Sequence, residues 1–181
     1  MPTEFATFAG GCFWCTEAIF KRLKGVISVT SGYSGGKRSA PTYEQIHSGA
    51  TGHAEAIQIE FDPSVLSYSV LLEVFWHMHN PTTLNQQGAD MGPEYRSVIF
   101  YHSDAQKKLA EESKKQLEDA KVYKNAIVTE IVPFTTFYKA EQEHQNFYEN
   151  YSGSPYCTFV IDPKIKKLLD QYGNLVKEEY K

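Results

Sequence analysis

The chain has 181 residues, of which 41% are hydrophobic and 22% are charged, and its formal net charge is −4. This composition is that of an ordinary globular protein, and a chain of this length buries roughly 70% of the surface that its unfolded form exposes. The acidic balance excludes the basic footprint of a nucleic-acid-binding protein. Since no run of about 18 apolar residues is present, a membrane span is excluded as well. We therefore expect one domain over residues 1–181.

The cysteine content favours a reducing compartment. Three cysteines are an odd number, which favours free reactive thiols over a secreted disulfide scaffold. The first residues, Met1 to Glu4, lack the basic and apolar segments of a signal peptide. We expect a cytoplasmic protein.

Hydrophobic spacing and turn residues predict alternating strands and helices in the first half of the chain. The predicted elements are a strand at Glu4–Ala9, a helix at Cys12–Lys24 ended by Gly25, a strand at Val26–Thr30, a loop at Ser31–Thr42, a strand at Glu55–Phe61 and a helix from a Ser67 cap to His77.

The second half continues this alternation after a long loop, which is typical of a functional segment. The predicted elements are the loop at Asn80–Glu94, a strand at Ser97–His102, a helix at Asp104–Lys121 begun by a Ser103–Gln106 capping box, a strand at Ala126–Val132, a helix at Ala140–Tyr151, a turn at Ser152–Pro155, a helix at Pro163–Tyr172 and a charged tail from about residue 173 that frays. The order predicts an α+β fold, a two-layer α/β sandwich with a mixed sheet, in the form of a ferredoxin-like plait with extra helices.

The segment at residues 10–15, Gly-Gly-Cys-Phe-Trp-Cys, is the strongest chemical signal in the chain. It places Cys12 at the N-terminus of a predicted helix, where unpaired N–H groups and the helix dipole favour thiolate over thiol. The two aromatic residues beside it offer an apolar wall for a small hydrophobic group. A buried cysteine pair that only packs is the alternative, but a Gly-Gly-Cys helix start favours a nucleophilic or redox-active thiol.

Glu55 is the second candidate for chemistry. It shares one face of its predicted strand with Ile57, Ile59 and Phe61, which should point into the core. A carboxyl group at the end of such a face is desolvated, which raises its pKa and keeps it protonated near neutral pH. A protonated acid beside a thiolate can donate its proton to an oxygen that leaves sulfur. The alternative is a solvated carboxylate at a frayed strand end.

The histidines and the cysteine pair give only a weak metal signal. The pair has the spacing of half a zinc site, but no second such pair follows, so no metal is expected. We expect His77 and His79 on the surface. Glu141 and His144, three residues apart in a predicted helix, share a face and could support a site, but a solvated pair is the favoured arrangement.

A glutaredoxin-like thiol–disulfide oxidoreductase that uses Cys12-x-x-Cys15 is the alternative enzyme class. Such proteins also open with a strand and a helix that begins at Cys-x-x-Cys. Against this alternative, the chain is much longer than such a small domain needs. In addition, Pro41 lies too early in the chain to serve as the cis-proline of that fold.

Several motifs together resemble the A-type peptide methionine sulfoxide reductases. These motifs run in order from residue 8 to about residue 166 and include Gly11-Cys12-Phe13-Trp14, Gly32-Tyr33, Pro41-Thr42-Tyr43, Gly52-His53-Ala54-Glu55, His79 with Pro81-Thr82, Gln87-Gly88-Ala89-Asp90, Tyr95-Arg96-Ser97, and Ala140-Glu141 with His144-Gln145. One such motif is weak evidence, but the set in this order is highly specific.

The resemblance implies a reaction and the residues that carry it. Members of this family reduce the S epimer of methionine sulfoxide, free or in proteins, and draw electrons from thioredoxin. Cys12 corresponds to the nucleophile that attacks the sulfoxide sulfur, and Glu55 to the proton donor. Tyr43 and Tyr95 correspond to the residues whose hydroxyl groups hold the sulfoxide oxygen. Oxygen transfer would leave Cys12 as a sulfenic acid, which a second thiol resolves as a disulfide.

The same resemblance assigns Phe13 and Trp14 to the pocket for the substrate S-methyl group, and Asp90 to shaping the site on the long loop. Because the cysteine sulfur itself takes the oxidation, no cofactor is expected. We also expect a monomer. The chain departs from the family pattern at Asn80 for a common Asp, His47 for a frequent Cys, Cys15 for a frequent Gly, and Met91, Pro93 and Glu94 before Tyr95.

Two cysteines are candidates for the resolving thiol. Cys15 lies one helical turn after Cys12, with about 5–6 Å between the Cα atoms, which is within disulfide reach. Cys157 follows Gly153 and Pro155 in a segment predicted to be mobile enough to reach the site. In similar family members a cysteine in this C-terminal stretch resolves the sulfenic acid. We therefore expect Cys157 to resolve first, with Cys15 either taking the disulfide onward by exchange or resolving directly.

Overall fold

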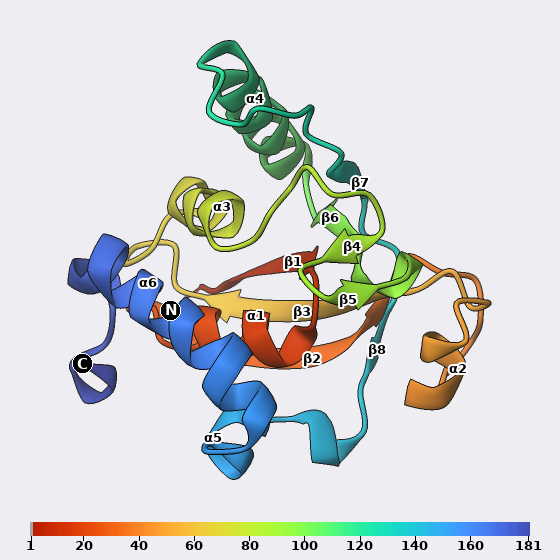
Figure 1. The fold of residues 1–181 in the computed structure, drawn as a ribbon. Helices are drawn as coiled ribbons and strands as arrows, with labels where there is room; N and C mark the ends of the chain where they lie inside the picture. The colour runs from red at the N-terminus through yellow and green to blue at the C-terminus, as the bar shows by residue number, and fades with distance from the viewer. Residues whose placement is uncertain (1) are drawn as a thin grey trace.

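A mixed sheet of six strands forms the centre of the molecule (Figure 1) in a computed structural model that describes residues 2–181. The strand order is β7-β6-β1-β3-β2-β8. The strands are β1 (Glu4–Gly10), β2 (Val26–Ser34), β3 (Ala54–Phe61), β6 (Ser97–Tyr101), β7 (Glu130–Pro133) and β8 (Phe137–Lys139). β6 and β7 are parallel, and the other neighbouring pairs are antiparallel.

Two helices connect the central strands. α1 (Phe13–Phe20) links β1 to β2, and α3 (Tyr68–His77) follows β3. The other helices are α2 (Tyr43–His47), α4 (Asp104–Asp119), α5 (Phe147–Tyr151) and α6 (Asp162–Tyr172), with α4 at the top of Figure 1. Across residues 2–181, no helix combines the length and hydropathy that a membrane crossing needs. The predicted α+β class with a mixed sheet is confirmed, whereas the ferredoxin-like plait stays a prediction.

Alternation along the strands separates the two faces of the sheet. On β3, Ile59 is fully buried in a large hydrophobic cluster with residues from α1 and α3. Ala56 belongs to a smaller cluster on the other face. Phe8 of β1 stacks on Phe75 of α3, with ring centroids 4.8 Å apart. The larger cluster thus lies between the sheet and helices α1 and α3, and it holds α1 against the sheet.

Side-chain caps begin two helices as predicted. Ser67 accepts a hydrogen bond of 3.2 Å from a main-chain N–H in the first turn of α3, and Ser103 accepts one of 3.2 Å from the N–H of Gln106. The predicted capping box at α4 also requires the Gln106 side chain to accept from the main-chain N–H of Ser103, and this part of the prediction is wrong. The Gln106 side chain instead accepts from the N–H of His102 and donates to the carbonyl of Phe5. This side chain therefore ties α4 to β1.

The segment between β2 and β3 is more regular than predicted. β2 continues to Ser34 because β3 and β8 pair with it. The helix before it, α1, is shorter than predicted and ends at Phe20. α2 forms at residues 43–47, where no helix was predicted. Thr42 and Gln45 form a capping box at its start. The signal for this helix was therefore present in the sequence.

The helix predicted at residues 140–151 is wrong. β8 extends the sheet up to Lys139, the 3-10 helix η2 covers Gln142–His144, and α5 begins only at Phe147. Asn146 adopts a left-handed conformation with φ of 53°, which interrupts any helical path. The strand predicted at residues 126–132 likewise begins only at Glu130.

The C-terminal tail is docked, and the prediction that it frays is wrong. Val176 is fully buried and pairs with Leu23 in an isolated β-bridge. The N–H of Lys177 donates to the carbonyl of Arg22 at 2.8 Å, and the Arg22 guanidinium lies 4.7 Å from the ring centre of Tyr180. These contacts join segments far apart in the sequence, so local composition did not reveal them.

Candidate active site

The turn between β1 and α1 presents Cys12 at the start of the helix, as predicted. Gly11 has φ of +93°, a conformation that glycine adopts without strain. A Cβ atom there would come within 2.6 Å of Gln87, so the turn also passes close to the long loop. Cys12 is the N-cap residue of α1, is 7% exposed and makes no capping bond through its side chain. Its sulfur is therefore free of a structural role at the helix N-terminus.

All three cysteines are unpaired thiols, and they lie in one buried cluster. The N–H of Cys15 donates to the carbonyl of Cys12 at 3.1 Å, which places the two thiols one helical turn apart. Cys15 Sγ lies 3.6 Å from the hydroxyl of Tyr156, which donates to Asp90 Oδ2 at 3.0 Å. The cluster also contains Cys157, which is fully buried.

The ionisation of the cysteine pair differs from the prediction. Burial raises the pKa of the Cys12 thiol well above its usual value, and the hydrogen bond with Cys15 and the charge of Glu55 act in the same direction. The hydrogen bond from Cys12 lowers the pKa of Cys15 to about 7, although burial opposes this shift. In the resting site burial thus favours the neutral thiol of Cys12, which is opposite to the effect predicted for the helix N-terminus.

Glu55 is buried, as the alternation of its strand predicts. It is 1% exposed and pairs across the strands with Tyr33 of β2. Its Oε1 accepts a hydrogen bond of 3.0 Å from the main-chain N–H of Phe13, which places the carboxyl group beside the start of α1. Burial raises the pKa of Glu55, although hydrogen bonds from His47 and Phe13 oppose the shift. The site therefore holds a carboxyl group that favours its protonated form.

α2 adds His47, to which no role was predicted. Nε2 of His47 lies 2.9 Å from Glu55 Oε2, and Nδ1 lies 3.4 Å from the hydroxyl of Tyr95. The His47 side chain is 29% exposed, so the ring connects a buried carboxyl group to solvent. The hydrogen bond with Glu55 raises the pKa of His47. The Thr42–Gln45 capping box is the signal that could have placed His47 on a helix.

Glu141 positions Tyr43, a supporting role that the sequence favours less than a solvated pair. Its two carboxylate oxygens accept hydrogen bonds of 2.9 Å from the N–H of Tyr43 and from the hydroxyl of Tyr33. The ring of Tyr43 packs against those of His47 and His144, with centroids 4.1 and 4.2 Å apart. The solvated helix pair predicted for Glu141 and His144 is wrong, because their segment is not an α-helix and His144 is buried.

Tyr43 and Tyr95, the residues predicted to hold the sulfoxide oxygen, face the same two reactive groups. Burial raises the pKa of each hydroxyl, followed by the charges of Glu55 and Cys12. Both hydroxyl groups are therefore protonated at neutral pH and available as donors. The structure brings these four side chains together, while the contact of each hydroxyl with a bound oxygen stays a prediction.

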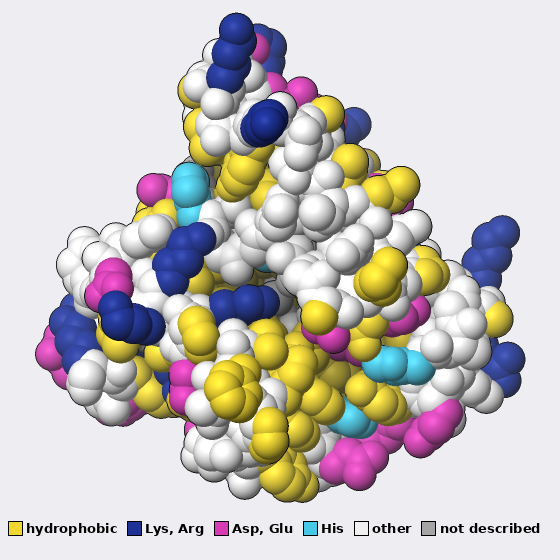
Figure 2. Space-filling model, viewed as in Figure 1, with side chains coloured by type: hydrophobic (Ala, Val, Ile, Leu, Met, Phe, Trp, Pro, Cys, Tyr) yellow, Lys and Arg dark blue, Asp and Glu magenta, His cyan; other side chains and the backbone are white. Residues whose placement is uncertain are grey.

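An aromatic wall borders the thiols. Trp14 stacks on Phe147 of α5 with ring centroids 3.7 Å apart, and its Nε1 donates to Nδ1 of His144 at 3.2 Å. Trp14 is half-buried, whereas Phe13 is fully buried and stacks on Tyr43 with centroids 6.4 Å apart. Trp14 thus lies at the surface of the site and Phe13 beneath it. Figure 2 shows hydrophobic side chains gathered below the centre of the face that it presents.

The long loop folds back on itself and delivers Asp90. β4 (Gln86–Gln87) and β5 (Asp90–Met91) form a small hairpin. The Gln87 side chain bonds both the N–H and the carbonyl of Asn80 at 3.0 Å, which closes the loop. Asn80 in turn accepts a hydrogen bond of 3.0 Å from the N–H of Thr82. An Asn fulfils this acceptor role as an Asp would, so the departure at this position leaves the loop intact.

Cys157 lies in helical backbone, and the prediction of a mobile segment around it is wrong. Helical structure resumes at Pro155, and the π-helical segment η3 (Cys157–Ile161) runs directly into α6. Pro163 has no main-chain N–H and would clash with the turn before it in a regular α-helix, and the wider π turn accommodates it. Cys157 is therefore held in place beside the cysteine pair.

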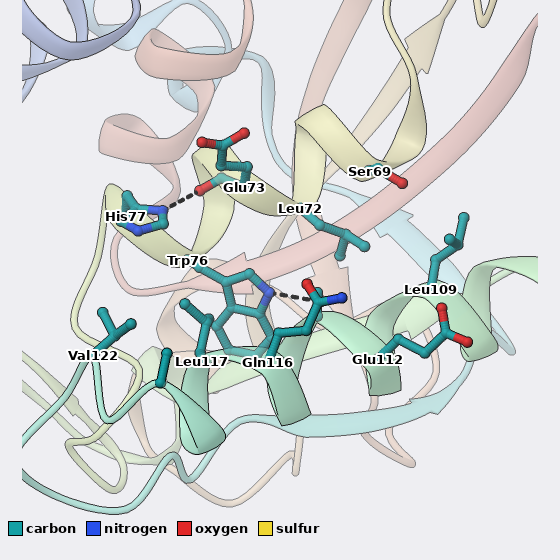
Figure 3. Close-up of a pocket in the computed structure, with 12 residues that line it drawn as sticks. Ser69, Leu72, Glu73, Trp76, His77, Leu109, Glu112, Gln116, Leu117 and Val122 are labelled. Atoms are coloured by element: carbon teal, nitrogen blue, oxygen red, sulfur yellow. Dashed lines mark hydrogen bonds between the residues drawn. The ribbon is translucent and has the colours of Figure 1, made fainter.

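Two other regions carry no obvious chemistry. Within residues 2–181, no group of three or more His, Cys, Asp or Glu side chains is placed to hold a metal ion. A hollow of about 340 Å³ lies between α3 and α4 (Figure 3), and none of the three cysteines lines it. It is lined in part by Trp76, whose Nε1 donates to Ser113 at 2.9 Å.

His79 is not the expected surface histidine, since both its ring nitrogens are bonded and burial lowers its pKa to about 4.

Sequence comparison agrees with the chemistry of this site. A family model for peptide methionine sulfoxide reductase matches residues 4–175. The peptide methionine sulfoxide reductase MsrA of Sulfolobus acidocaldarius is 57% identical over 169 residues, which cover 93% of this chain and 95% of that protein.

Solved structures agree with the sequence comparison. Mxr1 from Saccharomyces cerevisiae in reduced form matches with a TM-score of 0.79 at 33% identity, over 85% of this chain and 88% of that chain. Mxr1 in complex with Trx2 matches with a TM-score of 0.57 at 26% identity, over 80% of this chain and 84% of that chain. These matches do not favour the glutaredoxin-like alternative. The chain belongs to the A-type peptide methionine sulfoxide reductases, oxidoreductases that use thiols to reduce methionine sulfoxide.

Proposed function

We propose that this chain reduces the S epimer of methionine sulfoxide, free or within proteins, with Cys12 as the nucleophile and Glu55 as the proton donor. One observation carries the assignment: the residue after Cys12, Phe13, donates its N–H to Glu55 Oε1 at 3.0 Å. This bond holds the acid beside the thiol. Since burial favours the protonated form of Glu55, the acid is loaded before substrate binds.

The first step transfers oxygen from the substrate to Cys12. The Cys12 proton passes to the Cys15 thiolate one helical turn away. The bond between the substrate sulfur and oxygen breaks while an S–O bond forms on Cys12, so the substrate sulfur gains the two electrons that Cys12 loses. The proton of Glu55 goes to the oxygen, with Tyr43 and Tyr95 as hydrogen-bond donors to it. The products are methionine and a sulfenic acid on Cys12.

The aromatic wall supports the placement of the substrate. We place its S-methyl group against Trp14, which Phe147 and His144 hold in orientation. Phe13 supports the wall from beneath. Asp90 shapes the other side of the site through its bond with Tyr156.

Cys15 is the first resolving thiol in this proposal, ahead of Cys157. It lies one turn from Cys12, and in the first step it has taken the proton that the departing hydroxyl group of Cys12 needs. Its sulfur attacks the sulfenic acid, an S–S bond forms, and the hydroxyl group of Cys12 leaves as water after taking a proton. Cys157 lies in the same cluster and can take the disulfide onward by exchange, but its helix must open first.

Thioredoxin is the proposed reductant, because the related Mxr1 forms a complex with Trx2. The three free thiols support a cytoplasmic location. We also propose a monomer with a single catalytic domain over residues 1–181; the single domain is supported by the one six-stranded sheet whose strands and connections carry the proposed site.

Separate incubation with each epimer of methionine sulfoxide and dithiothreitol tests the function. We expect methionine from the S epimer and none from the R epimer. A protein that left both epimers untouched and reduced a mixed glutathione disulfide would be the glutaredoxin-like alternative.

A further inference from the structure

His47 joins a buried acid to solvent, and we propose that it is a positioning residue that supplies Glu55 with its proton. This inference rests on the proposed function, in which Glu55 protonates the sulfoxide oxygen. The resemblance to the family gives no role to a histidine at this position, where a cysteine is frequent.

The partners of Glu55 leave one route for a proton. Oε1 accepts from the main-chain N–H of Phe13, which does not exchange its proton in a catalytic cycle, and Oε2 lies 2.9 Å from Nε2 of His47. Glu55 is 1% exposed, so bulk water does not reach it directly. The His47 side chain is 29% exposed and presents its second nitrogen to the hydroxyl of Tyr95. A proton that reaches Glu55 from solvent therefore passes through this ring.

The surroundings of His47 favour its protonated form when Glu55 is ionised. The titratable groups that face the ring are Glu55 from β3, Glu94 and Tyr95 from the 3-10 helix η1 (Pro93–Tyr95), Asp90 from β5, His144 from η2 and Tyr43 on its own helix. The hydrogen bond and the charge of Glu55 raise the pKa of His47, as do the more distant carboxylates, while partial burial opposes them. The two groups therefore share one proton over a wider pH range than Glu55 alone would hold it.

In one turnover the pair moves one proton to the substrate oxygen. Glu55 gives up its proton as the bond from oxygen to the substrate sulfur breaks and the bond from oxygen to Cys12 forms. The neutral ring of His47, now beside a carboxylate, takes a proton from solvent. The imidazolium then donates its Nε2 proton to Glu55 across the 2.9 Å contact, so Glu55 is loaded for the next substrate and the ring is neutral again. Cys12 is oxidised and the substrate reduced, and His47 changes only its protonation.

The pH dependence of a single turnover tests this inference. Wild-type protein, His47→Gln and His77→Gln are mixed with the S epimer without reductant, and methionine is followed from about pH 5 to about pH 9. A glutamine keeps a donor to Glu55 but cannot exchange a proton, so the alkaline decline of the rate should move to lower pH by about one unit in His47→Gln. His77, on the outer part of α3, is the matched control and should keep the wild-type profile.

Each outcome is informative. An unchanged alkaline midpoint in His47→Gln would overturn the inference, whereas a wild-type protein that forms no methionine at any pH would overturn the proposed function instead. Added imidazole should restore steady-state turnover to His47→Ala, and failure to do so would also count against a proton route through this position.

Ring titration does not depend on activity and covers the case in which the variant fails to fold. In Cys12→Ser protein, the NMR pKa of His47 should lie above the ordinary 6.5. It should fall when Glu55 is replaced as well, by Glu55→Gln. A His47 pKa that does not respond to Glu55→Gln would show that the two groups do not share a proton.

Discussion

Cys15 donates its main-chain N–H to the carbonyl of Cys12 at 3.1 Å, and this first turn of the helix brings the two thiols close enough to change each other's pKa. The start of the helix therefore fixes how far apart the two sulfurs lie, and it allows one thiol to take a proton from the other. Because burial raises the pKa of Cys12 while the hydrogen bond from Cys12 lowers that of Cys15, we expect the thiolate to lie on Cys15 before substrate is attacked. The pair therefore keeps a thiolate beside Cys12 while both sulfurs remain buried.

Ultraviolet absorbance of the thiolate should show this arrangement. Wild-type protein should gain thiolate absorbance as pH rises through about 7, and Cys15→Ser should lose that step. Cys12→Ala removes the donor to Cys15, so the step should move to higher pH. Persistence of the step in Cys15→Ser would mean that the thiolate lies on another cysteine.

Replacement of Glu55 should slow the oxygen transfer specifically. Glu55→Gln keeps the shape and the hydrogen bonds of the side chain but has no acidic proton to give, so we expect a loss of roughly 10²–10⁴-fold in a single turnover. Glu17→Gln is the control, because Glu17 is also a buried carboxyl group of α1 but lies outside the proposed machinery. Methionine formation at the wild-type rate in Glu55→Gln would show that the proton comes from elsewhere.

The two candidate resolving thiols should separate in the recycling step. Cys15→Ser and Cys157→Ser should both form methionine in the first turnover, since Cys12 is intact in each, but Cys15→Ser should do so more slowly because it lacks the thiolate that takes the Cys12 proton. Turnover driven by thioredoxin should fall sharply in Cys15→Ser and less in Cys157→Ser. Peptide mapping after one turnover without reductant should find a Cys12–Cys15 disulfide, and a Cys12–Cys157 disulfide as the first product would reverse the order.

Glu17 should make the folded protein less stable as pH rises. It is 2% exposed, one oxygen accepts from the N–H of Asn146 at 3.0 Å, and burial raises its pKa from 4.5 to about 7. Between these values the unfolded chain binds fewer protons than the folded one, so the free energy of unfolding falls with rising pH, by roughly 3 kcal/mol at most.

Denaturant unfolding at about pH 4.5 and about pH 8 measures this effect. The difference in stability between wild type and Glu17→Gln should favour the variant at the higher pH and shrink at the lower one. Glu111→Gln, on the exposed face of α4, should leave the wild-type pH dependence unchanged. An equal response of all three proteins would place the Glu17 pKa near its ordinary value.

Local signals in the sequence were sufficient for the centre of this site. The alternation from Glu55 to Phe61 predicts a buried carboxyl group, and the Gly-Gly-Cys turn predicts a cysteine at a helix start. Both depend on short-range periodicity, which the larger core around Phe8 enforces. The Ser67 cap was found for the same reason, since the capping atoms lie within one turn.

The features that were missed depend on contacts between distant segments. Asn146 takes a left-handed conformation and ends a helical pattern that the residues around it would otherwise support. Glu141 reaches Tyr43 and Tyr33 only because β8 pairs with β2. Val176 holds the tail through Leu23, which lies near the other end of the chain. The pKa of Cys12 likewise depends on how deeply the complete fold buries it.

The central claim is that Cys12 takes the substrate oxygen, and a single turnover of the S epimer without reductant tests it most directly. Wild type should form at least one methionine per protein, with a second where Cys157 takes the disulfide and frees Cys12, whereas the double variant Cys15→Ser/Cys157→Ser should form only one and carry one added oxygen that mass spectrometry locates on Cys12 as sulfenic acid. Cys12→Ser should remain folded and form no methionine. Methionine formation by Cys12→Ser, or an added oxygen located on another residue of the double variant, would contradict the account.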